Sequence, residues 1–463
     1  MVDTIRNGPD NPAAAAPAGA WPLLGHAPAL LRDPLGFLGR AYGCGPVVRI
    51  RLGRAPAHLV NDAAAIRRIL VADAAGYDKG FQFDKLRVLI GDGVGTSTGA
   101  RHRRQRALMR PAFDHGRVAG YLAEMSRSTV AEVDAWPPGT GIEAGAVLRR
   151  LTMTIVCRSM FGSDSPAGAE VLRSLPALLG GVGLRALLPF DLLERLPVPA
   201  NRRFDQARAR LHAAVDLVIG EHRAHQAAGG YGDDLLAMLL ASVDEDDGSG
   251  MTDAQAHDEV MTILLAGTET AAGALAWALH LVSRDPALQA AVQAEVDAVE
   301  PSVRRPAGVT AAHLAQLSLL RRVLTEALRL YPPGWVLGRR PVRDTELAGV
   351  RVDAGTQLLL NFYGLHRDPG VFPDPDLFAP DRWSPGDRRA ADPELVRTHY
   401  LPFGVGSRGC VGEAFAWSEM LVVLTVVFSR FTVRPVPGSV VTPVARTTLH
   451  PRVLPLTLEP RPE

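Results

Sequence analysis

Apolar residues recur at helical spacing along most of the chain, whereas alternating, strand-like runs are confined to a few short segments. These segments are 47–52, 58–60, 357–361 and parts of the C-terminal region 440–458. A period near 3.6 residues indicates amphipathic helices, and strict alternation indicates half-buried strands. The pattern therefore predicts a mainly α fold with small β-sheets.

The longest uninterrupted helical pattern begins after Thr252 and ends at Asp285-Pro286. Thr252 and Gln255 form a capping-box pattern, which marks a helix start. The expected helix has about 32 residues and a length of about 48 Å. Its stretch 260–282 is apolar enough to imitate a membrane span. Glu269 lies near the centre of that stretch, however, where a charge is costly in a bilayer, so we expect a buried core helix.

Within this helix, residues 266–270 read Ala-Gly-Thr-Glu-Thr. Small residues at Ala266 and Gly267 are followed by an acid, Glu269, and a hydroxyl, Thr270. Glycine weakens a helix, and Thr is a poorer helix former than Ala. This segment of a buried helix therefore needs a packing or functional reason.

A glycine-rich loop carries one cysteine directly before another apolar helical run. Gly404 and Gly406 permit backbone conformations that a side chain forbids and allow close approach to a flat cofactor. Cys410 is expected at the N-terminus of the following helix, which favours an anion and lowers the pKa of a thiol. This arrangement suits a thiolate ligand for haem iron, with Arg408 available to a haem propionate. The alternative is an ordinary buried cysteine.

Two further charged clusters stand at helical spacing. Glu326 and Arg329 lie one turn apart in an expected helix 314–331, and Arg382 is a candidate for a second arginine on the same carboxylate. Without it, they would be an ordinary exposed ion pair.

The other cluster is the arginine-rich stretch 101–106. His102 and Arg106 lie one helical turn apart there, where both could reach one anionic group. The alternative is a solvated face or a docking patch.

Composition narrows the class of protein. The chain has 463 residues, 47% of them hydrophobic, and a formal net charge of +1, which argues against a nucleic-acid binder. Three cysteines, at 44, 157 and 410, are too few for a disulfide framework and favour a reducing cytoplasm. Prolines interrupt the N-terminal segment, so we expect a flexible tail over 1–20 and neither a signal peptide nor a membrane anchor.

Together these segments resemble the cytochrome P-450 family, the haem-thiolate monooxygenases, in its bacterial soluble type. Residues 403–412 match the family pattern F-x-x-G-x-R-x-C-x-G at every fixed position. Residues 266–270 match A-G-x-[DE]-T, 326–329 match E-x-x-R, and 378–383 resemble F-x-P-x-R-[FW]. The resemblance implies a single triangular, mainly helical domain over 21–463, with haem b between the long helix and the cysteine loop.

The resemblance also implies roles for individual residues. Cys410 would be the proximal iron ligand, whose thiolate favours O–O cleavage, with Phe403 and Gly404 beside the haem. Gly267, next to Ala266, would relax the helix where dioxygen binds, while Glu269 and Thr270 direct protons. Four residues match positions that hold the haem propionates, and three would tie the haem pocket together structurally. The first set is His102, Arg106, Arg339 (five residues before Asp344) and Arg408, and the second is Glu326, Arg329 and Arg382.

The implied activity is hydroxylation of a C–H bond in a hydrophobic small molecule, such as a terpenoid or another secondary metabolite. Electrons would pass from NAD(P)H through a separate ferredoxin reductase and ferredoxin, which could dock on the 101–106 stretch. Because an acidic partner binds through charge, high salt would slow the reduction. Expected substrate contacts are 76–95, Leu264 and Leu265, 335–337, and 447–449.

Three alternatives remain. The chain could be a fatty-acid hydroxylase, although no Arg or Lys stands where it would hold a carboxylate. It could use peroxide or catalyse coupling or dehydration, routes that do not need the Glu269-Thr270 pair. It could also be a haem sensor or electron carrier. Dependence of product on reduced ferredoxin tests the second alternative, and a substrate-induced spin-state change tests the third.

Overall fold

The computed structural model describes residues 17–137, 139–162, 166–187, 198–230, 232–245, 247–299, 309–384, 386 and 392–461. The expected flexible tail lies for the most part outside these described residues. The chain divides into two compact units. The first comprises the chain up to 81 with 335–375 and 391–409, and the second comprises 82–334, 376–390 and the chain from 410 onward. Each is described by itself.

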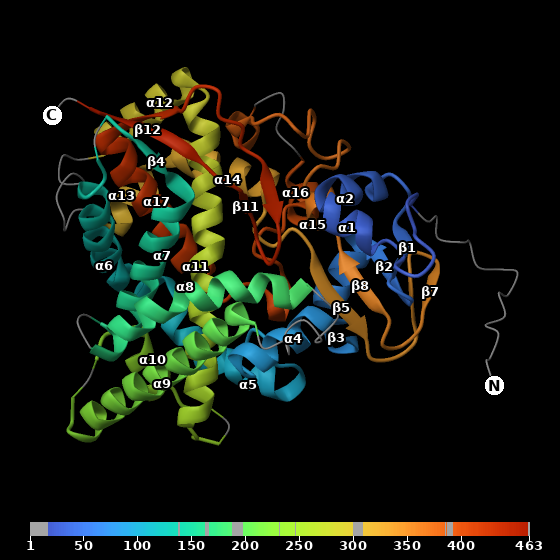
Figure 1. The fold of residues 1–463 in the computed structure, drawn as a ribbon, viewed down its shortest axis with the longest axis horizontal. Helices are drawn as coiled ribbons and strands as arrows, with labels where there is room; N and C mark the ends of the chain where they lie inside the picture. The colour runs from blue at the N-terminus through green and yellow to red at the C-terminus, as the bar shows by residue number, and fades with distance from the viewer. Residues whose placement is uncertain are drawn as a thin grey trace, which may run out of the picture. The chain divides into compact units, whose positions relative to one another are not determined.

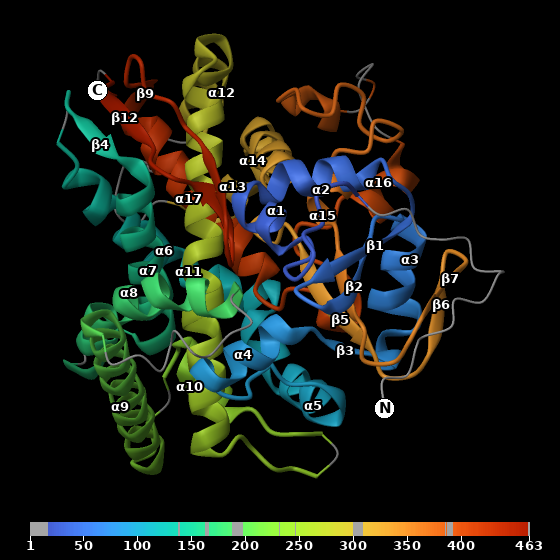
Figure 2. The ribbon, with the colours of Figure 1, turned by 45° about the vertical axis from the view of Figure 1, so that its right-hand side comes forward.

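The first unit is built on a five-stranded sheet (Figure 2). Its strands run in the order β1 (Val47–Leu52), β2 (Ala55–Val60), β8 (Gln357–Leu360), β5 (Leu337–Pro341) and β3 (Tyr77–Lys79). β2 and β8 are parallel, with His58 opposite Leu358, and the other neighbours are antiparallel. The predicted strands at 47–52, 58–60 and 357–361 are thus confirmed.

Helices and a small hairpin complete the first unit. Ile66, Ile69, Leu358 and Leu360 are fully buried in its core, so the apolar residues of β8 pack with the helical segment after β2. The remaining elements are α1 (Ala27–Arg32), α2 (Pro34–Tyr42), α3 (Ala63–Arg67), the π-helical turn η1 (Arg68–Ala72), η2 (Ala74–Gly76), β6 (Thr345–Leu347), β7 (Val350–Val352), α15 (Phe362–Leu365), α16 (Pro393–His399) and η6 (Gly406–Arg408).

The second unit is mostly helical, which confirms the mainly α prediction. Its helices are α4 (Phe81–Ile90, whose first residue belongs to the first unit), α5 (Gly99–Met109), η3 (Arg110–Phe113), α6 (His115–Asp134), α7 (Ala144–Phe161), α8 (Pro166–Leu187), α9 (Pro199–Ala227), α10 (Leu235–Ala241), α11 (Asp253–Ser283), α12 (Pro286–Ala298), α13 (Ala311–Gln316), α14 (Ser318–Leu330), η5 (Pro380–Trp383) and α17 (Glu413–Arg430). The second unit also contains two small sheets. One has three strands in the order β4 (Gly141–Glu143), β12 (Pro455–Pro460) and β9 (Phe431–Pro435), and the other is the hairpin of β10 (Pro443–Ala445) with β11 (Leu449–Pro451).

Helix α11 is the predicted long helix and passes between the other helices of its unit (Figure 1). The capping box is formed as expected: Thr252 Oγ1 accepts the Gln255 N–H at 3.2 Å, and Gln255 Oε1 accepts the Thr252 N–H at 3.0 Å. Helices α7, α14 and α17 pack against it. In the most apolar 18-residue stretch of this helix, 67% is buried, as expected for a core helix.

The single helix expected over 314–331 is wrong, because the chain leaves the helical conformation at Leu317 and forms α13 and α14 instead. A carboxylate from α12 starts the new helix. Glu295 Oε1 accepts the Leu319 N–H at 2.7 Å, and Oε2 accepts the Leu320 N–H at 2.9 Å. An acidic side chain is well placed against the free N–H groups and positive dipole end of a helix.

Candidate active site

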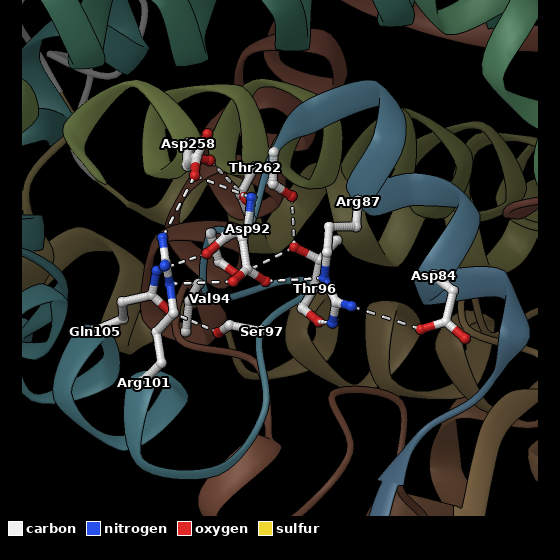
Figure 3. Close-up of polar contacts among 12 residues, drawn as sticks. Asp84, Arg87, Asp92, Val94, Thr96, Ser97, Arg101, Gln105, Asp258 and Thr262 are labelled. Carbon is white, nitrogen blue, oxygen red and sulfur yellow. Dashed lines mark hydrogen bonds and ion pairs between the residues drawn. The ribbon is translucent and has the colours of Figure 1, made fainter. Parts of the chain in front are cut away.

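The loop between α4 and α5 is fixed to α11 by a charged network (Figure 3). Asp92 pairs with Arg87 at 2.9 Å and with Arg101 at 3.2 Å. The backbone N–H groups of Asp92 and Val94 donate to carboxylates of α11, namely Asp258 at 3.0 Å and Glu259 at 2.8 Å. A Cβ on Gly93 would overlap Thr262, so the glycine permits this close approach.

This network also positions α5, which carries two of the residues matched to the haem propionates. Gln105 donates to the Asp92 carbonyl at 2.8 Å and accepts from the Ser97 hydroxyl at 2.5 Å. His102 and Arg106 both lie on α5, with His102 buried and Arg106 half-buried. The predicted spacing is thus present on one helix of the second unit.

The middle of α11 is open on one side. Ala266 is exposed although residues 271–279 of the same helix are buried. The Thr270 hydroxyl donates to the Ala266 carbonyl at 2.6 Å, and the buried Thr268 hydroxyl makes the equivalent bond to Leu264 at 2.7 Å. Thr270 therefore stands beside an exposed turn, whereas Thr268 is enclosed. Leu264 is fully buried, so it does not line the open side as expected.

Gly267 has a packing role in the structure. A Cβ at this position would come within 3.1 Å of Val156 on α7, which is tighter than ordinary contact. The α-helix is continuous from Asp253 to Ser283. The expected relaxation of the helix where dioxygen binds stays a prediction. The Thr152 hydroxyl of α7 instead donates to the Thr268 carbonyl at 3.0 Å. Helix α7 therefore fits closely against α11 at the glycine.

The Glu269 side chain points toward the hairpin of β10 and β11. The Thr447 hydroxyl donates to its Oε2 at 3.4 Å. Burial raises the pKa of Glu269, while Thr447, Arg149 and Arg446 act in the opposite direction. A half-buried carboxyl of this kind can hold a proton and can also release it.

Cys410 is surrounded by protein atoms, and yet its surface is accessible. It lies just before α17, whose N-cap is Gly412. Burial raises the pKa of the thiol to about 11, although the Gly412 N–H and Arg106 favour the thiolate. The predicted lowering of this pKa is therefore wrong for the thiol itself, because burial outweighs the helix N-terminus. Coordination to a metal would deprotonate it.

The other end of the cysteine loop belongs to the first unit. Gly404 and Gly406 adopt φ of 67° and 78°, as the loop pattern predicted. A Cβ on Gly406 would overlap the Leu70 carbonyl of η1, so this glycine is needed for packing within the protein. Phe403 beside them is half-buried.

Two arginines lie close together in the first unit. Arg339, on β5, is buried and donates from Nη1 to the Gly338 carbonyl at 2.8 Å. Arg408 donates from Nη1 to the Tyr77 carbonyl at 2.6 Å. Burial and the charge of Arg408 lower the pKa of Arg339 well below the usual range for arginine. A buried cation with a half-buried cation beside it is a good partner for an anion.

Glu326 brings together the arginines expected from the sequence. Arg329 donates to it from Nε and Nη2, both at 2.8 Å, and Arg382 donates from Nε at 3.1 Å. The indole N–H of Trp383 and the backbone N–H of Ala379 also donate, at 2.9 and 3.1 Å. All three charged side chains are fully buried. The prediction of a structural cluster is confirmed, and the exposed ion pair is excluded.

The arginine-rich stretch is less free than expected. Arg101 pairs with Asp92 at 3.2 Å, and Arg104 pairs with Asp244 at 3.1 Å. Two of the arginines that were expected to bind a partner therefore already pair with carboxylates of the protein.

Three comparisons with known proteins agree on one family. The family model described as Cytochrome P450 matches residues 16–457. The chain belongs to the cytochrome P450 family. It is 40% identical to cyclooctatin synthase of Streptomyces melanosporofaciens, over 96% of this chain and 95% of that protein. It is 37% identical to pentalenene oxygenase of Streptomyces avermitilis, over 97% and 98%. The solved structure of retinoic acid-bound cyanobacterial CYP120A1 superposes with a TM-score of 0.85 at 25% identity, covering 97% of this chain and 100% of that chain.

As a cytochrome P450, the protein is a monooxygenase that uses haem iron and dioxygen, and the sensor alternative is excluded. The residues present fit this cofactor. Cys410 is an exposed cysteine just before α17, and Ala266 is exposed in the middle of α11, whose following residues 271–279 are buried. In the first unit, described by itself, buried Arg339 and half-buried Arg408 offer positive charge for carboxylates. The roles of individual residues, His102 and Phe403 included, stay predictions.

Thr447 was expected to contact substrate, and its contact with Glu269 was missed. The two residues are 178 positions apart, and no periodicity links a hairpin tip to a helix centre. Thr152, which reaches the Thr268 carbonyl from another helix, was missed for the same reason.

Proposed function

We propose that this cytochrome P450 hydroxylates a largely apolar, terpenoid-like small molecule in the cytoplasm, with haem b bound through Cys410. The observation that carries the proposal is the centre of α11, where the Glu269 carboxyl and the Thr270 hydroxyl flank an exposed turn. Cys410 belongs to the same unit of the chain. An acid and an alcohol beside an open turn are suited to guided protonation.

The bound haem iron supplies dioxygen activation: one oxygen atom enters the C–H bond, and the other leaves as water with two electrons and two protons. Cys410 would hold the iron as a thiolate. Glu269 would supply protons from its side of α11, and Thr270 would pass them on at the exposed turn. His102, Arg106, Arg339 and Arg408 would bind the propionates through charge-assisted hydrogen bonds.

The substrate class rests on the names of relatives. The names pentalenene oxygenase and cyclooctat-9-en-7-ol 5-monooxygenase denote an alkene and an alkenol, both short of charged groups. The second of these proteins is 38% identical over 96% of this chain. These names favour an uncharged hydrocarbon skeleton over a fatty acid. A panel of cyclic alkenes and fatty acids, screened by the spin-state change of the haem, tests the choice; a response to fatty acids alone would contradict it.

A small acidic ferredoxin, reduced from NAD(P)H by its reductase, is the proposed electron donor. A surface hollow of about 870 Å³ in the second unit reaches Val411, next to Cys410. Arg106, Arg110 and Arg321 line it together with Asp114 and Glu413, and the Arg321 guanidinium lies 4.7 Å from the centre of the Trp417 ring. The reduction rate should fall as salt rises, because screening weakens such pairing. A rate independent of salt would contradict this docking, and product formed with peroxide alone would favour the peroxide-using alternative.

The proton-supply role is tested by Thr270→Ala. The variant should bind haem normally but divert reducing equivalents from product to hydrogen peroxide, since the hydroxyl beside the exposed turn is lost. The matched control is Thr268→Ala, which removes a hydroxyl with the same helix bond in a buried position. The measurement is the ratio of product to NAD(P)H consumed. Unchanged coupling in Thr270→Ala would disprove the role.

A further inference from the structure

One face of α11 is covered by the tip of the hairpin formed by β10 and β11. Glu269, Gly273 and Trp277 lie at successive turns on this face. The Trp277 indole donates to the Leu449 carbonyl at 3.3 Å, and a Cβ on Gly273 would come within 3.2 Å of the same oxygen. The glycine and the tryptophan therefore fix the hairpin tip against the helix, and Thr447 is thereby placed at Glu269.

The hairpin tip, residues 446–448, is itself held in a defined conformation. Ala445 pairs with Leu449 across the two strands, and the Arg446 N–H donates to the Thr448 carbonyl at 3.1 Å. The Leu449 N–H donates to the Pro333 carbonyl at 3.2 Å. These bonds fix the backbone that carries Thr447.

The charged groups around the Glu269 carboxyl come from two elements. The charges of Arg149, on α7, and of Arg446, at the hairpin tip, both lower the pKa of Glu269, and Arg149 also pairs with Glu143 at 3.9 Å. His450, on β11, lies near both arginines, and its pKa is lowered by burial and by their charge, which keeps it neutral. The carboxylate form of Glu269 is therefore opposed by burial and supported by two cations and one hydroxyl.

We propose that Thr447 is a positioning residue for Glu269: its hydroxyl holds the carboxyl at the hairpin tip and sets how readily the carboxyl takes up a proton. This inference deepens the proposed function and rests on it for its catalytic meaning. After Glu269 gives up a proton toward Thr270, the carboxylate is stabilised by Thr447, Arg149 and Arg446, and a proton from solvent restores the acid. Without the Thr447 donor, the carboxyl would bind its proton more tightly.

The test is a titration of the Glu269 carboxyl in the haem-loaded protein by difference infrared spectroscopy, with the band assigned by its loss in Glu269→Gln. Thr447→Val removes the donor at nearly constant volume, and the proton affinity of Glu269 should rise about three- to tenfold, the effect of one ordinary hydrogen bond. Thr447→Ser keeps a hydroxyl and should titrate like the parent protein. Thr448→Val is the matched control, because its hydroxyl lies against His450 at 3.5 Å and not against Glu269. Equal titration of Thr447→Val and the parent protein would overturn the proposal.

A second readout separates this proposal from the proposed function. If Glu269 supplies protons in its acid form, the ratio of product to NAD(P)H consumed should fall at a higher pH in Thr447→Val than in the parent protein. The shift along the pH axis should equal the shift of the infrared titration midpoint. If Glu269→Gln leaves coupling unchanged, the proton-supply role fails, whereas the infrared shift still decides whether Thr447 positions the carboxyl. An infrared shift in Thr448→Val as large as in Thr447→Val would assign the effect to the hairpin as a whole and refute the specific contact.

Discussion

Two pairs of arginines differ in how their charge is compensated. Arg329 and Arg382, in the helical unit, share the carboxylate of Glu326, which accepts from both. Arg339 and Arg408, in the unit built on the five-stranded sheet, donate to backbone carbonyls and repel each other, while Asp78 favours the charged form of Arg408. The first pair shares one carboxylate of the protein, whereas in the second pair the like charge of Arg408 beside Arg339 favours a further anion, such as one from a cofactor. The comparison separates charges that hold the fold from charges that hold a ligand.

The largest effect is expected from Glu326→Gln. Removing one partner of a buried ion cluster leaves two guanidinium groups without their carboxylate, which costs about 3 to 5 kcal/mol of unfolding free energy. The loss should appear in urea denaturation of both the haem-free and the haem-loaded protein. The control is Glu394→Gln, whose pair with Arg397 is exposed, and which should change stability by less than about 0.5 kcal/mol. If Glu326→Gln unfolds like the parent protein but loses haem, the Glu326 cluster would hold the cofactor and not the fold, which would contradict the comparison.

A different result is expected from Arg408→Leu and Arg339→Leu. Arg339→Leu removes a buried cation that has a like charge beside it, so the haem-free protein should be as stable as the parent protein or more stable. Arg408→Leu also removes an attraction to Asp78, so its haem-free form should lose no more than about 1 kcal/mol of unfolding free energy. Haem affinity should fall about 10- to 100-fold, because a charge-assisted hydrogen bond is lost. Haem titration of the apoprotein and urea denaturation measure the two effects. Arg343→Leu, at an exposed pair with Asp73, is the control. If either variant is strongly destabilised but keeps its haem affinity, Arg339 and Arg408 would be structural, like Arg329 and Arg382.

The smallest effect is expected from Arg106→Gln. Arg106 is half-buried and lines the surface hollow, so solvent weakens its hold on an anion. Haem affinity should fall by less than about tenfold, with Arg103→Gln, at an exposed position on the same helix, as control. If the rate of reduction by ferredoxin falls and haem affinity does not, Arg106 serves docking alone.

Spacing along the sequence predicted one charged cluster and one helix start. Glu326 and Arg329 are one turn apart, and the capping box of Thr252 with Gln255 marks a helix start, so both could be recognised without a fold. The break at Leu317 could not, because the carboxylate that starts α14 comes from Glu295 on another helix. Contacts between distant segments need the fold to be known.

The candidate site shows the same limit. The motifs identified Cys410, Glu269 and Thr270 as candidates, and the family assignment gives their chemistry. The sequence did not predict that burial raises the pKa of the Cys410 thiol, or that Gly267 makes room for Val156. Both effects depend on what packs around a residue, which spacing along the chain does not describe.

The most direct test of the account is the optical spectrum of the reduced carbon monoxide complex, measured for the parent protein and for Cys410→His. The account predicts the thiolate signature in the parent protein, its persistence in Cys44→Ser and Cys157→Ser, and its loss in Cys410→His with haem still bound. Retention of the thiolate signature in Cys410→His would contradict the assignment of Cys410 as the iron ligand.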